Sequence, residues 1–392
     1  MRRFAYALVL ASASGVAAPT FAQDAPRDAM RAAFAAVIAN PQDVDANLAY
    51  ARAAIDAGEP RKAVAAYDRV LAVDPDNAEA AAGLARLDGV VEADATGART
   101  TIDLALGVLY ETNPTLRGQD QQSDADFGVT YAARLSDSRP IYGVRLESAL
   151  SAAGQQRADD GDVVDVAGFG LQTGPVFDLA GLTGVEGLSL ATQASFSIAW
   201  FGDEGFSDRL LNSYGVAFDL RSAATGVFKG ATFAYAFDHY RGDAVEDRTA
   251  RVYGLSAQFA ERDLLLGQDE LSVTPRLVIY EAREDFFSYR EFGGSVAYTL
   301  GLPGWGGFAA SAVRAEFDAS TRMYRGEFNG IGEDRSDQFY SVGARYTLAQ
   351  WDDLPVALSG SYHYDVNASN VRDFDFDNHR IGLTASMRFE PW

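Results

Sequence analysis

The sequence has 392 residues but no cysteine, only three histidines, and so few basic side chains that its formal net charge is −22. Without cysteine there are no disulfides, no thiol catalysis, no cysteine-based metal sites and no lipid-modified N-terminal cysteine. The acidic balance argues against nucleic-acid binding, which needs a basic face. The sequence shows no convincing set of catalytic residues, so we expect neither an enzyme nor a resident cofactor.

Long apolar runs are missing too, because no segment reaches the roughly 18 consecutive apolar residues of a membrane-spanning helix. The one sustained apolar stretch, residues 4–16, follows two arginines and precedes a small-x-small pattern at residues 20–22. This order is typical of a secretory signal peptide, whereas a first core helix is the alternative. We therefore predict a signal peptide over residues 1–22 and export to a Gram-negative envelope.

Alanine and apolar side chains at helical spacing dominate residues 23–92. Pro41 and Pro75 each mark a turn, and they are 34 residues apart, which is the period of a tetratricopeptide repeat. Between them, Gly58 falls at a predicted inter-helix turn and Tyr67 lies on one face of the following helix. The segment resembles about two tetratricopeptide repeats, the first and last incomplete, and we predict a small periplasmic α-helical domain.

Such repeats present a concave surface to a partner. If this domain binds a client, the predicted docking residues are Asn47, Tyr50, Ala54 and Ala81. A helical spacer without a ligand is the alternative. Two repeats are fewer than usually fold alone, so we expect the domain to depend on the rest of the chain or on a second copy.

From Thr101 onward the hydrophobic period changes from that of a helix to that of a strand. In the last segment, apolar side chains from Ile381 to Phe389 alternate with polar ones that include Arg380 and Arg388. One apolar and one charged face fit a strand with lipid outside and water inside. A soluble β-sandwich is the alternative, but it rarely has so many strands. We predict a mainly β chain with a transmembrane antiparallel barrel over residues 98–392.

About fourteen segments show this alternation, with lengths near the roughly ten residues of a tilted membrane strand. They lie at 101–110, 126–135, 141–152, 163–174, 187–201, 210–221, 229–240, 249–261, 270–281, 290–301, 306–318, 337–349, 355–365 and 379–389. An even number puts both ends of the barrel in the periplasm. Alternate links are long and acidic, as extracellular loops should be, and the others are mostly short; the link 175–186 is longer than this rule predicts.

The inward face is predicted to carry glycines that relieve crowding and let strands bend. They are Gly107, Gly128, Gly143, Gly215, Gly254, Gly293, Gly343 and Gly382. The same face carries mixed charges, as is common in water-filled pores. These charges are Arg134, Arg145, Arg276, Arg345, Arg380, Arg388, Glu147 and Asp219. His363 and Asp365 also share this face, but no second inward acidic pair accompanies them, so a rim protease is not expected.

The order of signal peptide, tetratricopeptide repeats and a barrel of about fourteen strands resembles the surface lipoprotein assembly modulator (Slam) family. Two short motifs add to this resemblance. Tyr110-Glu111-Thr112-Asn113 closes the first strand, like an aromatic-acidic-x-Asn motif of that family. Asn367-Ala368-Ser369-Asn370 precedes the final strand, like the family's N-x-S-N segment. The resemblance covers nearly the whole mature chain.

The resemblance implies that periplasmic repeats capture a client lipoprotein and that the barrel conducts or displays it. An exopolysaccharide-export porin is one alternative, and a passive solute porin with a vestigial helical domain is another. Expected partners are the client lipoprotein or polymer, outer-membrane lipids and the barrel-assembly machinery. The terminal aromatics Phe389 and Trp392 resemble the signal which that machinery reads, although Trp392 also fits an aromatic girdle.

Overall fold

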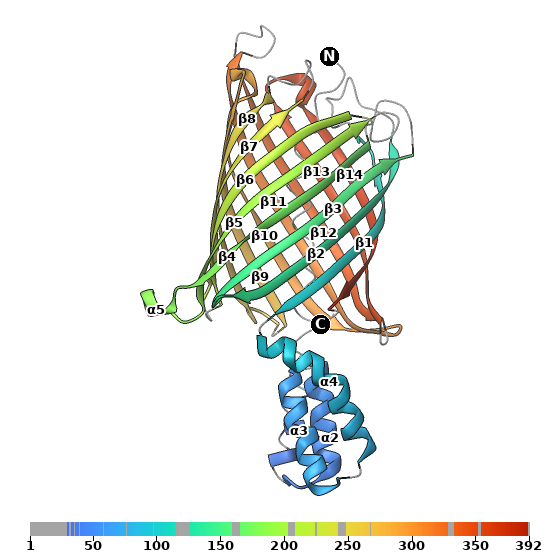
Figure 1. The fold of residues 1–392 in the computed structure, drawn as a ribbon. Helices are drawn as coiled ribbons and strands as arrows, with labels where there is room; N and C mark the ends of the chain where they lie inside the picture. Colours follow the sequence, from blue (N-terminus) through green and yellow to red (C-terminus); the bar gives the residue numbers. More distant parts are fainter. Residues whose placement is uncertain are drawn as a thin grey trace. The chain divides into compact units, whose positions relative to one another are not determined.

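The computed structural model describes residues 30, 33–34, 36–38, 40–57, 59–75, 77–96, 98–114, 116, 125–158, 165–202, 208–223, 226–241, 248–266, 268–327, 333–351 and 354–390. The predicted signal peptide and Trp392 lie outside these residues. The chain divides into two compact units, a helical unit and a barrel unit that holds Thr101–Ser136 and Val144–Phe389. Figure 1 labels the helices of the first unit and the strands of the second.

The helical unit contains α2 (Val44–Asp56), α3 (Pro60–Val73) and α4 (Ala78–Thr96). Helix α2 begins after Asp43, whose carboxylate accepts a hydrogen bond from the Ala46 backbone N–H at 3.0 Å. Helix α3 has Pro60 in its first turn, where the absent N–H costs nothing. No helix among the described residues is long and apolar enough to cross a membrane.

Alanines, two tyrosines and several larger aliphatic side chains fill the core of this unit. Ala51, Ala63 and Val70 are almost fully buried around Tyr67, which is 1% exposed. This burial raises the pKa of the Tyr67 hydroxyl. A Cβ at Gly83 on α4 would overlap the Tyr67 ring, so the glycine lets α4 approach α3 closely. Alanines and a glycine around one aromatic ring explain how so short an alanine-rich segment packs tightly.

Fourteen strands form one closed antiparallel barrel in which each strand pairs with its neighbours in the chain, and β1 pairs with β14. The strands are β1 (Arg99–Glu111), β2 (Asp126–Ile141), β3 (Val144–Arg157), β4 (Asp165–Asp178), β5 (Leu188–Gly202), β6 (Asp208–Ser222), β7 (Phe228–Tyr240), β8 (Ala250–Arg262), β9 (Asp269–Ala282), β10 (Tyr289–Pro303), β11 (Phe308–Glu327), β12 (Asp334–Trp351), β13 (Leu354–Ser369) and β14 (Phe376–Phe389). The predicted fold class is therefore confirmed.

The two ends of the barrel differ. Ile102 on β1 pairs with Phe389 on β14, so both ends of the barrel chain lie at the same end, which we name the terminal end. The opposite end, the loop end, carries the links after odd-numbered strands, such as residues 112–125. Links at the terminal end are mostly short, and that between β2 and β3 has two residues. Short turns at one end and longer loops at the other are typical of bacterial membrane barrels.

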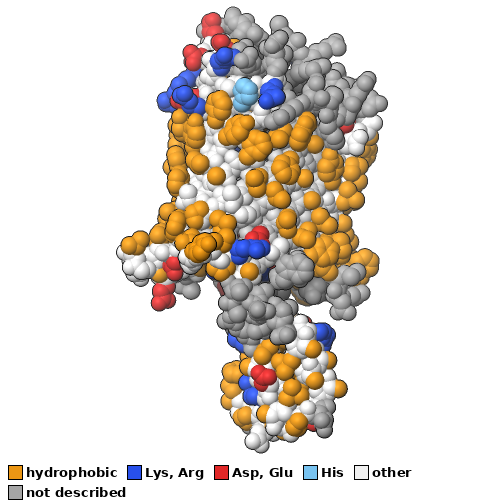
Figure 2. All heavy atoms as spheres, viewed as in Figure 1, with side chains coloured by type: hydrophobic (Ala, Val, Ile, Leu, Met, Phe, Trp, Pro, Cys, Tyr) orange, Lys and Arg blue, Asp and Glu red, His pale blue; other side chains and the backbone are white. Residues whose placement is uncertain are grey.

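The outer surface of the barrel carries a broad apolar band (Figure 2). Leu106 and Leu383 are each 61% exposed, and Val342 is 54% exposed. The residues that alternate with these apolar side chains face the lumen and are small or polar. Gly107 and Thr384 are examples: a Cβ at Gly107 would lie 2.8 Å from the Thr384 hydroxyl on the neighbouring strand. Apolar side chains exposed in this regular alternation need lipid around them, so the barrel is of the membrane-spanning type.

Two local predictions need correction. Gly143 does not face the lumen from a strand; with Tyr142 it forms the β2–β3 turn, and both residues have positive φ, 51° and 82°. Such a two-residue turn matches the twist of paired strands, so β2 continues through the predicted link at 136–140. The long link 175–186 is explained by an extended β4 and by the short helix α5 (Ala180–Thr183), which ends at Gly184 with φ 71°.

The inside–outside pattern gives a first prediction. Leu383 lies near the middle of β14 on the outer face, so Leu383→Arg should cost about 2–4 kcal/mol of unfolding free energy. Ser386→Arg, on the inner face of the same strand, should cost far less. Phe389→Arg should fall between them because Phe389 ends the strand. Urea unfolding in lipid vesicles measures all three; equal losses for the first two variants would contradict the assignment of faces.

Candidate functional site

The first family-like motif ends β1 at the loop end. Tyr110 points outward, with its ring centroid 4.9 Å from that of Phe127. Glu111 points inward and forms an ion pair with Arg157 of β3; the two side chains are only 8% and 7% exposed. A buried carboxylate is tolerated when a guanidinium and further donors compensate it. Arg157 was not identified from the sequence, because β3 was expected to end at residue 152.

Asn113 and Asn378 complete this arrangement, and both are fully buried. The Asn113 backbone N–H donates to Asn378 Oδ1 at 2.8 Å, and the Asn378 amide donates to Glu111 at 3.3 Å. We name Glu111, Asn113, Arg157 and Asn378 the seam cluster, because β1 and β14 meet here. At the terminal end of the same seam, Arg388 pairs with Asp103 at 2.6 Å. The motif therefore holds the first and last strands together.

The second motif joins three other segments at the loop end. Asn367 donates its amide to the carbonyl of Phe374 at 2.6 Å and so fixes the short 3-10 helix η6 (Arg372–Phe374). The Ser369 hydroxyl donates to Asp337 at 2.7 Å, and Asn370 accepts from the Ser336 N–H at 2.7 Å. Both motifs thus connect strands and loops, and η6 and Asn378 follow the second motif in the chain.

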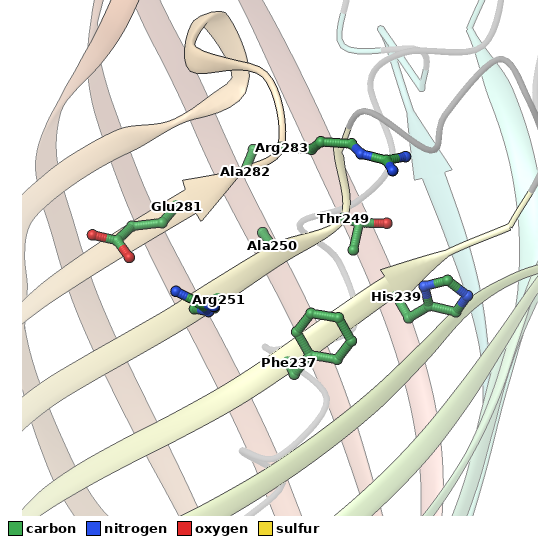
Figure 3. Close-up of a pocket in the computed structure, with 8 residues that line it drawn as sticks. All are labelled: Phe237, His239, Thr249, Ala250, Arg251, Glu281, Ala282 and Arg283. Atoms are coloured by element: carbon green, nitrogen blue, oxygen red, sulfur yellow. The ribbon is translucent and has the colours of Figure 1, made fainter.

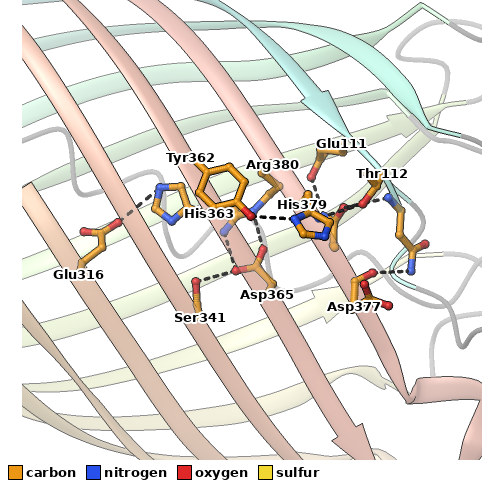
Figure 4. A network of polar contacts seen from close by, with 12 residues as sticks. Glu111, Thr112, Glu316, Ser341, Tyr362, His363, Asp365, Asp377, His379 and Arg380 are labelled. Atoms are coloured by element: carbon orange, nitrogen blue, oxygen red, sulfur yellow. Dashed lines mark hydrogen bonds and ion pairs between the residues drawn. The ribbon is translucent and has the colours of Figure 1, made fainter.

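The inward His363 and Asp365 do not form a catalytic-type pair (Figure 4). Asp365 accepts from Arg380 at 2.5 and 3.1 Å and from Ser341 at 2.6 Å. His363 Nε2 lies 3.5 Å from Glu316 instead. Asp365 contacts the neighbouring strands β12 and β14, and His363 reaches across β12 to β11, so these polar contacts connect the barrel wall from β11 to β14.

A second group of lumen charges lies on β9, β10 and β11, and we name it the lumen cluster. Arg276 contacts Asp318 at 2.5 and 2.9 Å and Glu291 at 3.1 Å. Arg322 contacts Glu291 at 2.6 Å. Arg276 was predicted from the sequence to face the lumen, whereas Glu291, Asp318 and Arg322 were not, although Glu291 lies two residues before inward Gly293 and therefore shares its face.

Aromatic rings continue this cluster toward the loop end. Tyr289 stacks on Tyr280, with centroids 5.0 Å apart and planes 5° apart, and the Arg322 guanidinium lies 4.6 Å from the Tyr289 ring. Arg335 of β12 lies 3.3 Å from the ring of Phe374 and 4.4 Å from that of Tyr324. Cation–π contacts of this kind, together with ion pairs, hold η6 against β11 and β12 at the loop end of the barrel.

The predicted docking face of the helical unit needs correction. Asn47, Tyr50 and Ala54 are buried, and only Ala81 is exposed. The Asn47 amide donates to the carbonyls of Pro41 and Asp43, and its oxygen accepts from Arg69 at 2.8 Å. A polar residue that looked suited to a ligand instead satisfies the backbone at the start of α2.

An exposed face does exist on the same unit, and α2 and α4 share it. Arg52 on α2 forms two hydrogen bonds of 2.7 Å with Glu79 on α4. The hydrogen bond and charge of Glu79 raise the pKa of Arg52.

At the other end of the chain, Phe389 is the last residue of β14 and Trp392 lies outside the described residues, so the assembly signal stays a prediction.

The comparisons with known proteins bear on both units. Residues 20–87 match the tetratricopeptide repeat model, and no curated protein matches the chain. A bacterial polysaccharide outer membrane secretin is 10% identical, with 74% of this chain and 98% of that chain covered and a TM-score of 0.41. A loop-deletion mutant of OmpT, an outer membrane protein of Vibrio cholerae, is 9% identical, with 74% and 99% covered and a TM-score of 0.37. The outer membrane protein OpdK of Pseudomonas aeruginosa is 12% identical, with 75% and 99% covered and a TM-score of 0.34.

The repeat match and the closed barrel together confirm the expected order of parts, tetratricopeptide repeats followed by a barrel of fourteen strands. That order is the architecture on which the resemblance to the Slam family was based. The tetratricopeptide repeat match covers residues 20–87 and does not extend into the barrel. What the barrel can do must therefore be argued from its own residues.

The lumen cluster yields a second prediction. Glu291→Gln leaves Arg276 and Arg322 without their shared charge, so the pore should become more selective for anions, and the barrel should lose about 1–3 kcal/mol. Reversal potentials in planar bilayers under a salt gradient measure the selectivity. Glu281→Gln removes a carboxylate from the outer face and is the matched control. A shift of equal size in both variants would contradict a role inside the lumen.

Proposed function

We propose that this chain is an outer-membrane export protein that captures a client through its helical unit and passes it to the cell surface through the barrel. One observation carries the proposal: a tetratricopeptide unit precedes a closed barrel, and α4 ends at Thr96 while β1 begins at Arg99. So short a link supports the proposal that the helices lie on the side of the membrane where β1 begins. In bacterial barrels with short turns at that end, this side is the periplasm.

The resemblance to the Slam family suggests a lipoprotein as the client. A passive solute porin has no evident use for a protein-binding repeat at its periplasmic side, whereas an exporter must capture its client before passage. The polar groups of the lumen also favour transport over catalysis, because the charges that we describe are engaged in ion pairs between strands. In this proposal the chain is not an enzyme.

A polysaccharide client is the second candidate, and the aromatic rings of the lumen favour it. Flat rings stack on sugars, and guanidinium groups bind acidic substituents. However, Tyr289 is covered by Tyr280 and by Arg322. A ring that is already covered offers little surface to a passing polymer, so we place the lipoprotein first.

Loss of the gene product tests the proposal. A strain that lacks this chain should lose one or more surface lipoproteins, seen by protease treatment of intact cells, and these proteins should accumulate in the periplasm. Loss of a surface polysaccharide with unchanged lipoproteins would favour the second candidate. Reduced solute uptake with an unchanged surface would refute export altogether.

The sidedness can be tested separately. Cleavable tags inserted near residues 120, 160 and 330 should be accessible to protease added to intact cells, because these segments connect strands at the loop end. A tag in the Tyr142–Gly143 turn or near residue 353, at the terminal end, should be cleaved only after the outer membrane is opened. Cleavage of the second group in intact cells would reverse the orientation.

A further inference from the structure

Basic side chains collect on the outer face of the barrel at the loop end, from β7 to β11. We name this set the basic rim; it consists of His239, Arg251, Arg283, Arg290 and Arg325. The strand register puts Arg251 opposite Phe237, and Arg290 between Ile279 and Met323. The basic rim therefore borders the exposed apolar band directly, and Figure 2 shows basic side chains above that band.

Part of the basic rim surrounds a cavity of about 500 Å³ (Figure 3). Phe237 and His239 line it from β7, Arg251 from β8 and Glu281 from β9; Thr249 just before β8 and Arg283 just after β9 complete the lining named here. Glu281 is the one carboxylate in this lining, against two arginines. A cavity with a surplus of positive charge is notable in a chain whose net charge is −22.

Three arginines of the basic rim differ from three arginines of the lumen in their partners. Inside the barrel, Arg157, Arg276 and Arg322 are each in an ion pair with a carboxylate. Among the residues that the structure describes, the side chains of Arg251, Arg290 and Arg325 make no hydrogen bond or ion pair. Glu281 lies opposite Arg251 across the strand pair but is not within ion-pair distance of it, so these exposed guanidinium groups are available to an anion from outside the protein.

We propose that the basic rim binds the phosphate groups of a lipid A molecule, whose acyl chains lie on the apolar band directly below. The continuity between the two surfaces carries this assignment. An anion held only by solvent would not need apolar residues beside it, whereas a lipid has both a charged head group and chains. Arginine is suited to this role because its planar guanidinium matches phosphate with two parallel hydrogen bonds. Thr249 offers a hydroxyl beside the same cavity.

Leu255 and Phe292, each at least half exposed, lie further along the same faces of β8 and β10 and would contact the chains. The choice of leaflet rests on the proposed sidedness, in which the loop end faces the cell exterior. The tag experiment tests sidedness alone, so its failure and the failure of the lipid site can be told apart.

Native mass spectrometry of the purified full-length chain tests the site. The probe is lipid A with two phosphates, titrated in detergent against the wild type and against Arg251→Ser/Arg290→Ser. Each arginine near a lipid surface contributes about a factor of five, so the double variant should bind about 25-fold more weakly. Arg145→Ser/Lys229→Ser removes the same charge at the terminal end and should bind like the wild type. Arg251→Lys/Arg290→Lys should bind with an affinity between that of the wild type and that of the serine variant, because lysine keeps the charge but not the two parallel hydrogen bonds.

Dephosphorylated lipid A and inorganic phosphate distinguish the source of the anion. Dephosphorylated lipid A should bind wild type and double variant equally weakly, and inorganic phosphate should not displace lipid A at equal concentration. Heat-dependent gel mobility reports whether each variant is folded, and the lysine variant keeps the test valid if the serine variant is not. Equal binding of lipid A to the wild type and the folded serine variant would overturn the proposal. Displacement by inorganic phosphate alone would also overturn it, since the site would then not be one for lipid.

Discussion

Replacing Arg157 with methionine is expected to lower the unfolding free energy of the barrel by about 3–5 kcal/mol. The change leaves the Glu111 carboxylate buried without a cation, with the amides of Asn378 at 3.3 Å and Gln155 at 3.4 Å as its neutral donors. An isolated buried charge is far less favourable than a paired one, because neither water nor a cation compensates it. Urea unfolding after refolding into lipid vesicles measures the loss.

Two further variants test whether the loss of stability comes from the burial of the ion pair or from its position where β1 meets β14. Arg388→Met breaks an ion pair with Asp103 on the same two strands, but those side chains are 48% and 31% exposed, so the expected loss is under about 1 kcal/mol. The double change Glu111→Met/Arg157→Met removes both buried charges and should recover most of the stability. Equal losses for Arg157→Met and Arg388→Met would contradict the view that burial makes the seam cluster important.

The barrel could be predicted from the sequence because each membrane strand repeats the same alternation. β8 was expected at 249–261 and is found at Ala250–Arg262. β11 was expected to end at residue 318, but it continues to Glu327. Beyond Phe317 its outer face is mixed, with Thr321 and Arg325 beside Met323, while backbone pairing with β12 extends the strand regardless of side-chain type. Polarity patterns report where lipid ends, and they do not report where a strand ends.

The partners of site residues could not be predicted in the same way. Glu111 belongs to a recognisable motif, but Arg157 lies 46 residues further along the chain. Their contact depends on the register across β1, β2 and β3, which a single sequence does not specify. The predicted docking residues of the helical unit were wrong for another reason. Asn47 is polar, but its side chain makes its hydrogen bonds within the unit. Polarity alone does not distinguish a binding residue from one that satisfies buried backbone groups.

Deleting residues 24–90 is expected to leave a folded barrel and to abolish surface display of the client. The barrel should persist because its strands satisfy one another's backbone hydrogen bonds in a closed ring. Client capture should fail because the residues that match the tetratricopeptide repeat are removed. Surface proteomics of intact cells measures display, and heat-dependent gel mobility of the outer-membrane fraction measures folding.

Point variants on the helical unit sharpen this result, because a deletion removes both the binding surface and any support that the unit provides. Arg52→Glu reverses a charge on the exposed face that α2 and α4 share, and it should reduce display while the helices stay folded. Tyr67→Ala should instead unfold the unit, since it empties a core position that is 1% exposed and costs about 3–5 kcal/mol. If capture by this face is the rate-limiting event, both variants lose display but only Tyr67→Ala becomes sensitive to protease. Full display in the deletion strain would mean that the barrel works without the repeats, and the export proposal would then lose the observation that carries it.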